Sequence, residues 1–322
     1  MRLACIDIGT VTARLAVADV EGGRVVRLAK HSEICNLGEG VDATGRLRQE
    51  AMERVFACAR GYVDSAREAG AVAACCTLTS AARDAENARE LGAALDSLGL
   101  DPLIIPGEVE GALTFLGVAQ DFRGRRLLVA DNGGGSTELA RGSLGEDGTF
   151  ELAFVRSVDV GCRRVTEKFL ASEGPASKDE LAAAHAFVAH AFAPVVEEGG
   201  LWAAGSGRAV ADAPELLVVC MTPLLFGVDT DALPRERVEA LEARLAALTV
   251  EERAALPGLQ TKRAPVMLGG AVAVSELMRQ TGFESLTASE SDLLFGLALA
   301  AAATLSGTES PVGWKPTMRP LR

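Results

Sequence analysis

The chain has 322 residues, which is long for a single hydrophobic core and indicates two domains. Hydrophobic residues make up 48% of it and charged residues 24%, a balance typical of a globular protein and not of a disordered one. The net charge of −12 argues against nucleic acid as a partner, because such binding depends on a basic face. A small anionic substrate is still compatible with it, since a site can be locally positive inside an acidic protein.

The seven cysteines and three histidines show no spacing typical of metal ligands. There is no CxxC pair, and His185 and His190 do not stack on a helix as a zinc pair would. Cysteines in apolar runs indicate buried free thiols and a reducing compartment. With no signal peptide and no run of about 18 apolar residues, the sequence predicts a cytoplasmic protein without a membrane span.

The chain begins with a predicted buried strand over residues 2–8, followed by a turn at Gly9 and Thr10. A second strand, a glycine turn and a third strand at 25–29 come next. Further on, apolar side chains at helical spacing predict an amphipathic helix. The later elements of this half are expected at 46–69 (helix), 72–78 (strand), 101–106 (strand) and 107–120 (helix).

The segment from Leu127 to Glu138, another strand followed by a glycine turn, repeats the first strand and turn of the chain. Asp7 to Ala16 aligns without gaps with Asp131 to Ala140, and Asp, Gly, a hydroxyl and Leu-Ala recur at the same offsets. Glycines leave backbone N–H groups uncovered, and successive N–H groups attract phosphate oxygens. The repeat therefore predicts a duplicated domain with a phosphate loop in each half. The alternative is a coincidence of two ordinary Gly-rich hairpins.

The second half is expected to continue as an α/β domain. A Gly205-Ser206-Gly207 turn could contact phosphate or a nucleoside, or could be a plain strand–helix turn. The predicted domains are 1–122 and 123–305, with the last helix free to pack back on the first domain, and a loose tail over 306–322. The elements expected are strands at 127–130, 150–156, 201–204 and 285–288, and helices at 177–197, 235–248, 265–280 and 291–305.

Five segments of the first half form a recognisable set of motifs. They are IDIGTVTARL at 6–15, NLGEGVDATGRL at 36–47, TSAARDAEN at 79–87, IPGEVEGALTFLGV at 105–118 and VADNGGGSTEL at 129–139. In order and spacing they resemble the exopolyphosphatase / guanosine pentaphosphate phosphohydrolase family of the actin–Hsp70–sugar kinase superfold. A weaker likeness continues through SVDVGCRRVTEKF at 157–169 and AAGSG at 203–207.

The resemblance implies an α/β fold of two ribonuclease-H-like domains with the active site in the cleft between them. Members of the family remove the terminal phosphate of inorganic polyphosphate, or the γ-phosphate of pppGpp, using water and Mg²⁺. The chain is similar to the short, two-domain members. A homodimer is left open, because holding long polymers would need a dimer groove.

Matched by motif, Glu110 is the catalytic base, and Asp131 and Glu138 are the metal- and water-positioning carboxylates. From the residues alone, Glu110 could simply complement a helix dipole. Asp7 is a second candidate for holding Mg²⁺. The residues expected to bind phosphate are Gly9, Thr10, Thr12, Arg83, Gly133, Gly134, Gly135, Ser136 and Thr137.

The chain departs from the family near its C-terminus. Where the family has a Leu-Arg-Glu-Gly signature, this chain has Leu293-Leu294-Phe295-Gly296. Where the family has an Arg-Ala-Asp segment, this chain has Arg263-Ala264-Pro265. Asp292, Glu290 and Lys262 are candidates to compensate.

Two other functions are compatible with the sequence. One is a nucleotide or alarmone sensor that has lost efficient turnover, and the other is an ATP-dependent kinase of the same superfold. The kinase would need an adenosine pocket, which only the Gly205–Gly207 turn suggests.

Overall fold

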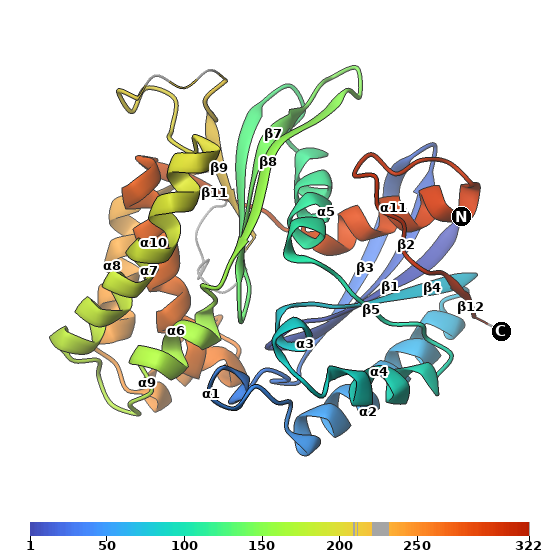
Figure 1. Ribbon diagram of the computed structural model, residues 1–322, viewed down its shortest axis with the longest axis horizontal. Coiled ribbons are helices and arrows are strands. Elements are labelled where there is room, and N and C mark those ends of the chain that lie inside the picture. The colour runs from blue at the N-terminus through green and yellow to red at the C-terminus, as the bar shows by residue number, and fades with distance from the viewer. Residues whose placement is uncertain (209, 211, 221–231, 322) are drawn as a thin grey trace. The chain divides into compact units, whose positions relative to one another are not determined.

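The computed structural model describes residues 1–208, 210, 212–220 and 232–321. The chain divides into two compact units. The first joins Met1–Gly117 with Ser291–Arg322, and the second is Val118–Glu290 (Figure 1). Each unit carries its own mixed sheet and its own buried core.

In the first unit, β1, β2 and β3 form an antiparallel meander, and β4 and β5 continue the sheet in parallel beyond β1. Helix α11, from the C-terminal segment, packs on the meander. The elements are β1 (Arg2–Ile8), β2 (Thr12–Glu21), β3 (Arg24–Ile34), α1 (Val41–Thr44), α2 (Gln49–Glu68), β4 (Ala73–Leu78), α3 (Ser80–Asp84), α4 (Ala88–Asp96), β5 (Leu103–Ile104), α5 (Gly107–Ala119), α11 (Leu293–Ser306) and β12 (Arg319–Pro320).

In the second unit, β6, β7 and β8 form the equivalent meander, and β9 and β11 continue it in parallel beyond β6. The antiparallel strand β10 closes this edge. The elements are β6 (Arg126–Asn132), β7 (Thr137–Leu144), β8 (Phe150–Val158), α6 (Cys162–Phe169), α7 (Lys178–Gly199), β9 (Leu216–Val219), β10 (Leu233–Pro234), α8 (Arg235–Ala246), α9 (Val250–Ala254), the 3₁₀ helix η2 (Thr261–Val266), α10 (Met267–Thr281) and β11 (Ser285–Ala288).

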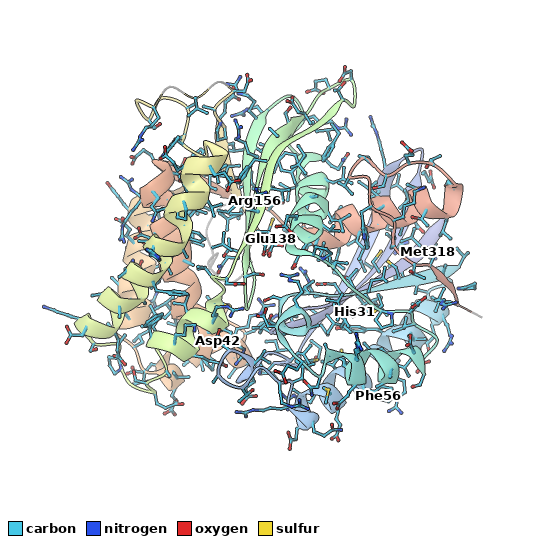
Figure 2. All side chains as sticks on the ribbon, in the orientation of Figure 1. His31, Asp42, Phe56, Glu138, Arg156 and Met318 are labelled. Carbon is cyan, nitrogen blue, oxygen red and sulfur yellow. The ribbon has the colours of Figure 1, made fainter. Side chains whose placement is uncertain are left out.

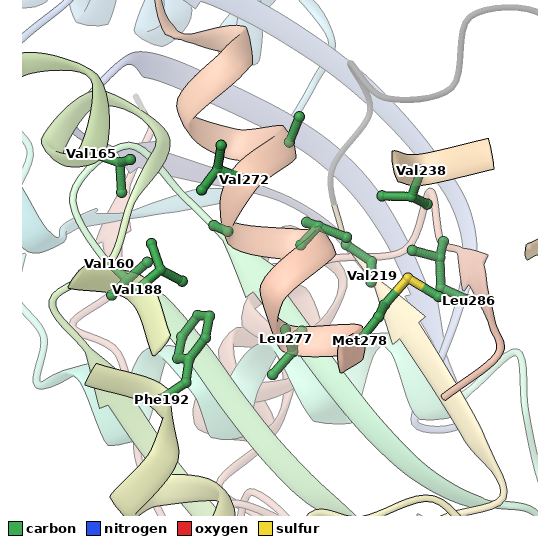
Figure 3. Close-up of a cluster of buried hydrophobic side chains, with 14 of the residues drawn as sticks. Val160, Val165, Val188, Phe192, Val219, Val238, Val272, Leu277, Met278 and Leu286 are labelled. Carbon is green, nitrogen blue, oxygen red and sulfur yellow. The ribbon is translucent and has the colours of Figure 1, made fainter. Parts of the chain in front are cut away.

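The two sheets share one topology, a three-stranded meander extended by parallel strands on the side of its first strand. The expected pair of ribonuclease-H-like α/β domains is therefore confirmed. In the second unit, α6, α7 and α10 bury Val165, Phe192 and Val272 in the core (Figure 3). Helix α7 begins at a capping box, in which Ser177 and Glu180 each accept from the other's backbone N–H.

One predicted strand is wrong. Residues 201–204 form no strand, and their backbone makes single bonds, from Ala203 N to the Thr281 carbonyl and from Ala204 N to that of Pro214. The parallel neighbour of β6 is β9, another short apolar run further along the chain. No helix follows Gly207 among the described residues before β9, so the expected strand–helix turn there is also wrong.

The C-terminal segment differs from the loose tail expected from its composition. Residues from Ser291 onward belong to the first unit, and β12 pairs antiparallel with β4 at Ala73 and Ala74. Arg319 also reaches Asp101, with Nη2 donating to Oδ2 at 2.9 Å. These backbone and side-chain bonds give the segment a fixed place that proline and glycine content alone does not indicate.

Candidate active site

The turn between β1 and β2 holds the first predicted phosphate loop. The Gly9 N–H donates to the Thr12 carbonyl at 2.9 Å and closes the turn. The Thr10 carbonyl accepts from Gly38 N, and the Val11 carbonyl accepts from the backbone of Cys35 and Asn36. The segment after β3 therefore binds one side of this turn.

The turn between β6 and β7 is built in the same way. The Gly133 N–H donates to the Ser136 carbonyl at 2.9 Å, at the same offset as in the first turn. Here the carbonyls are bound by the beginning of α6. Gly133 O accepts from Cys162 N and Gly134 O from Arg163 N, both at 2.9 Å. The Gly135 carbonyl accepts from Arg164 Nε at 2.7 Å.

These bonds fix the direction of the N–H groups in the second turn. In a planar trans peptide, the N–H points opposite to the preceding carbonyl. Since the carbonyls of Gly133, Gly134 and Gly135 point to α6, the N–H groups of the next three residues point away from it. Gly161 permits the close approach, because a Cβ there would overlap the backbone of Gly134. The turn thus presents successive N–H groups on one side, as a phosphate nest does.

The two turns differ in the residue that faces the aspartate across the meander. In the first unit Asp7 is paired with Arg14, and Nη2 and Nε donate to Asp7 Oδ2 at 2.6 and 3.0 Å. In the second unit Asp131 is opposite Glu138, labelled in Figure 2. Direct cross-strand neighbours have Cβ atoms about 5 Å apart, and like charges there repel. In the first turn the aspartate is therefore opposite a guanidinium, and in the second it is opposite another carboxylate.

This difference bears on which residues could hold a divalent cation. Asp131 and Glu138 could supply carboxylate oxygens, the hard donors that Mg²⁺ prefers, beside the Gly133–Ser136 turn. Ser157 Oγ donates to Glu138 Oε1 at 2.6 Å and orients that side chain. Asp7 is 1% exposed and already paired with a guanidinium, so this geometry does not favour it as a ligand. In the described part of the chain, no three His, Cys, Asp or Glu side chains form a protein-only metal site.

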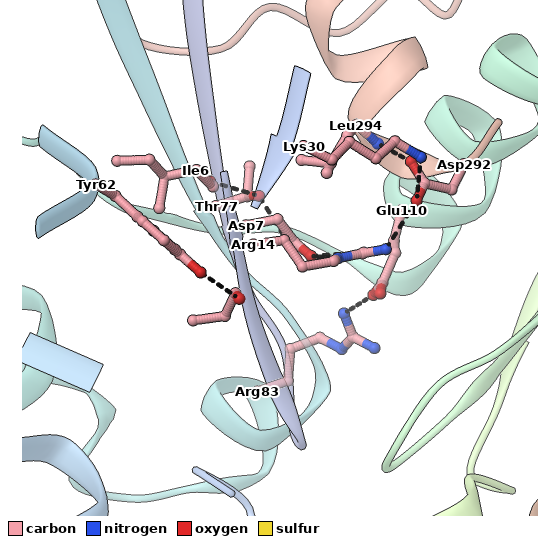
Figure 4. A network of polar contacts seen from close by, with 11 residues as sticks. Ile6, Asp7, Arg14, Lys30, Tyr62, Thr77, Arg83, Glu110, Asp292 and Leu294 are labelled. Carbon is pink, nitrogen blue, oxygen red and sulfur yellow. Dashed lines mark hydrogen bonds and ion pairs between the residues drawn. The ribbon is translucent and has the colours of Figure 1, made fainter. Parts of the chain in front are cut away.

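Arg83 and Glu110 come together in the first unit (Figure 4). Arg83 Nη1 donates to Glu110 Oε2 at 2.7 Å and to the Ile105 carbonyl at 3.0 Å. Glu110 is 8% exposed, whereas Glu108 in the same helical turn is exposed. Glu110 is thus a buried, oriented carboxylate, unlike an acid that only complements the helix dipole.

The hydroxyls of the loops have different surroundings. The Thr137 hydroxyl donates to the Val160 carbonyl and accepts from Asn132 Nδ2, so it serves the turn itself. Thr10 Oγ1 is buried and has no hydrogen-bond partner among the described residues. Within the described part of the chain, the hydrogen-bonding capacity of this hydroxyl is therefore unused. Burial raises the pKa of the Cys162 thiol beside the second turn, which argues against a thiolate nucleophile there.

Two charged residues beside the first turn, Arg14 and Lys30, were missed from the sequence, and Asp292 was singled out there without its ion-pair partners. Asp292 Oδ2 accepts from Arg14 Nη1 and from Lys30 Nζ, each at 3.1 Å. The gapless repeat contained a signal for the first of them, because Arg14 aligns with Glu138. The contact with Asp292 joins residues 278 positions apart, and no local pattern indicates it.

A profile of the Ppx/GppA phosphatase family matches residues 16–301. The chain therefore belongs to the Ppx/GppA phosphatase family, and the comparisons place it among phosphoanhydride hydrolases.

The chain is 34% identical over 324 residues to "Exopolyphosphatase 2" of Mycobacterium tuberculosis, covering 94% of this chain and 98% of the relative. It is 27% identical over 297 residues to "Exopolyphosphatase 1" of the same organism, covering 89% and 84% of the two chains. Among solved structures, an exopolyphosphatase from Cytophaga hutchinsonii superposes with a TM-score of 0.82 at 23% identity, covering 98% of this chain and all (100%) of that one. This last likeness concerns the fold alone.

Proposed function

We propose that the protein hydrolyses the terminal phosphoanhydride bond of inorganic polyphosphate in a Mg²⁺-dependent reaction, and that pppGpp is a second candidate substrate. The observation that carries the proposal is the turn Gly133–Ser136, which presents N–H groups next to the Asp131–Glu138 pair. Family membership and the relatives named exopolyphosphatase support the same substrate class.

In the proposed reaction, Glu110 takes a proton from a water molecule whose oxygen attacks the terminal phosphorus. The bond from that phosphorus to its bridging oxygen breaks, and orthophosphate leaves a chain shorter by one phosphate. Arg83 keeps the Glu110 carboxylate oriented for this task. Phosphoryl transfer depends more on positioning and charge neutralisation than on covalent chemistry, so no protein nucleophile is needed.

The remaining residues bind the substrate. The N–H groups of the two turns and the Thr10 hydroxyl hold phosphate oxygens. Mg²⁺, when held by Asp131 with support from Glu138, would neutralise charge on those oxygens. Asp7 is proposed to serve the site by fixing Arg14.

The test measures phosphate release from short polyphosphate, long polyphosphate and pppGpp in parallel, with Mg²⁺, for the wild type and two variants. Glu110→Gln keeps the shape of the side chain but cannot accept a proton, so turnover should be lost while substrate binding is retained. Glu108→Gln is the matched control, because Glu108 lies in the same helical turn and is exposed. A Glu110→Gln variant that hydrolyses polyphosphate at the wild-type rate would show that the assignment of the base is wrong.

Two further measurements, of ppGpp binding and of phosphate transfer from ATP, separate the alternative functions. Tight binding of ppGpp without phosphate release from any substrate would support a sensor. Phosphate transfer from ATP only when an acceptor is present would support a kinase, whereas free phosphate without an acceptor supports the hydrolase.

A further inference from the structure

Four charged side chains of the first unit form one cluster beside the turn between β1 and β2 (Figure 4). Arg14 lies between two carboxylates, those of Asp7 and Asp292. Lys30 also reaches Asp292, and its Nζ lies 5.1 Å from the centre of the Phe295 ring. These side-chain contacts of the cluster thus join two cations to two anions.

The two carboxylates are not equivalent. The Asp7 side chain is 1% exposed, so its pair with Arg14 belongs to the interior. The Asp292 side chain is 15% exposed, and those of Arg14 and Lys30 are 25% and 31% exposed. Solvent and small anions can reach these three groups, so the ion pairs made by Asp292 are the ones that a bound anion can exchange.

Asp292 also has a second task at the start of α11. Its Oδ1 accepts from the Leu294 N–H at 2.9 Å, which makes it the N-cap of the helix. The cap holds Oδ2 in place for Arg14 and Lys30. The helix start therefore brings a carboxylate to both cations next to the loop and the Phe295 ring to Lys30.

We propose that Asp292 is a positioning residue that sets the affinity of the first unit for phosphate anions, by holding Arg14 and Lys30 in ion pairs with which the anion must compete. The inference rests on the proposed function, since it assumes that phosphate groups bind at this turn. Ion pairs between partly exposed groups are modest, so removing the Asp292 charge should strengthen anion binding by about three- to tenfold.

The experiment separates charge from capping. Asp292→Asn and Asp292→Ser remove the charge, and both new side chains are good N-caps. Asp292→Ala removes the charge and the cap together. Asp64→Asn removes one carboxylate from the exposed face of α2 and controls for net charge. Binding of bis(methylene)triphosphonate, a polyphosphate analogue that cannot be hydrolysed, is measured by calorimetry with Mg²⁺, together with KM and kcat for tripolyphosphate and the melting temperature.

The expected result is a lower Kd for the analogue and a lower KM in both Asp292→Asn and Asp292→Ser, with no gain in kcat and near wild-type melting temperatures. Adding Lys30→Met to Asp292→Asn should remove part of the gain. An unchanged or higher Kd in both capped variants would overturn the proposal and leave Asp292 as a cap only. The analogue also keeps the two proposals apart. If the wild type releases no phosphate, the proposed function fails, and the Kd values still decide the role of Asp292.

Discussion

Arg83 and Glu110 form an ion pair, with Nη1 and Oε2 2.7 Å apart, in which the carboxylate is nearly buried. The family resemblance implied separate tasks for these residues, an anion-binding arginine and a catalytic base. Their contact means that the Arg83 guanidinium binds and orients the Glu110 carboxylate. Any phosphate oxygen that binds Arg83 has to share the guanidinium with Glu110.

Replacing Arg83 by Met should therefore impair catalysis more than binding. Without the guanidinium, the buried carboxylate loses its positive neighbour and accepts a proton more readily. We expect kcat for polyphosphate to fall by about tenfold or more, and the acid limb of the pH–rate profile to move to higher pH. Arg89→Met, at an exposed position in α4, is the control. A profile that keeps its acid limb would contradict the pairing as a catalytic device.

The contrast between Asp7 and Asp131 gives a second prediction. Asp131→Asn should raise the Mg²⁺ concentration for half-maximal activity by about tenfold or more, because one hard anionic donor is lost. Asp7→Asn should leave that concentration nearly unchanged but lower the free energy of unfolding by about 2–4 kcal/mol, because the pair with Arg14 is broken at a buried carboxylate. Mg²⁺ titrations of activity and denaturant unfolding of both variants test this. Equal shifts in the Mg²⁺ requirement would refute the distinction.

His185 predicts a pH dependence of stability in the second unit. Its Nε2 lies 2.8 Å from Glu242 Oε1 and its Nδ1 3.4 Å from Glu276 Oε2, and these contacts raise its pKa from 6.5 to about 9 against the opposing effects of burial and Arg279. A raised pKa favours the folded state while the ring is protonated. The stabilisation, on the order of 2 kcal/mol, is therefore complete below about pH 6.5 and lost as the pH rises through about 9.

Unfolding by denaturant between pH 6 and pH 10 measures this effect. His185→Gln should flatten the decline in stability over that range. His190→Gln should not, because His190 lies on the same helix and is exposed. A wild-type curve that is level from pH 6.5 to pH 9.5 would rule out the proposed contribution.

Helices α5 and α11 pack so closely at Gly117 and Gly296 that neither position has room for a side chain. A Cβ at Gly296 would overlap the Leu113 carbonyl oxygen, and one at Gly117 would overlap the backbone of Asp292. Gly296→Ala should therefore destabilise the protein by about 2 kcal/mol or more, as forced overpacking does. Gly61→Ala in the exposed face of α2 meets no atom within 4 Å and should stabilise by about 0.5–1 kcal/mol. Melting temperatures that move in the same direction for both variants would contradict this account.

The sequence predicted most of the strands, helices and turns, because hydrophobic spacing and glycine positions determine them locally. The gapless repeat placed Gly9 and Gly133 at the same offset, and both close their turns with the same hydrogen bond. The strand at 201–204 was wrong because short apolar runs do not show their partners, and pairing with β6 selects Leu216–Val219 instead.

The sequence predicted individual residues of the candidate site but not the contacts that these residues make with one another. The family motif singled out Glu110, but its local pattern alone was that of a helix-dipole acid until its burial and its contact with Arg83 were known. The role of Asp292 could not be predicted, because it depends on a contact with Arg14, a residue 278 positions away in the sequence. The assignment of catalytic and metal-binding roles stays a prediction, as does a site shared by the two units.

The first unit is made from both ends of the chain, with α11 lying on the meander and β12 paired to β4. During synthesis, the second unit is continuous and has all of its residues before Ser291 is added. The first unit cannot be completed until α11 has been made, and until then the face of β1 to β3 that α11 covers stays open. The part of the chain that is made first therefore finishes folding only after all residues of the second unit have been made.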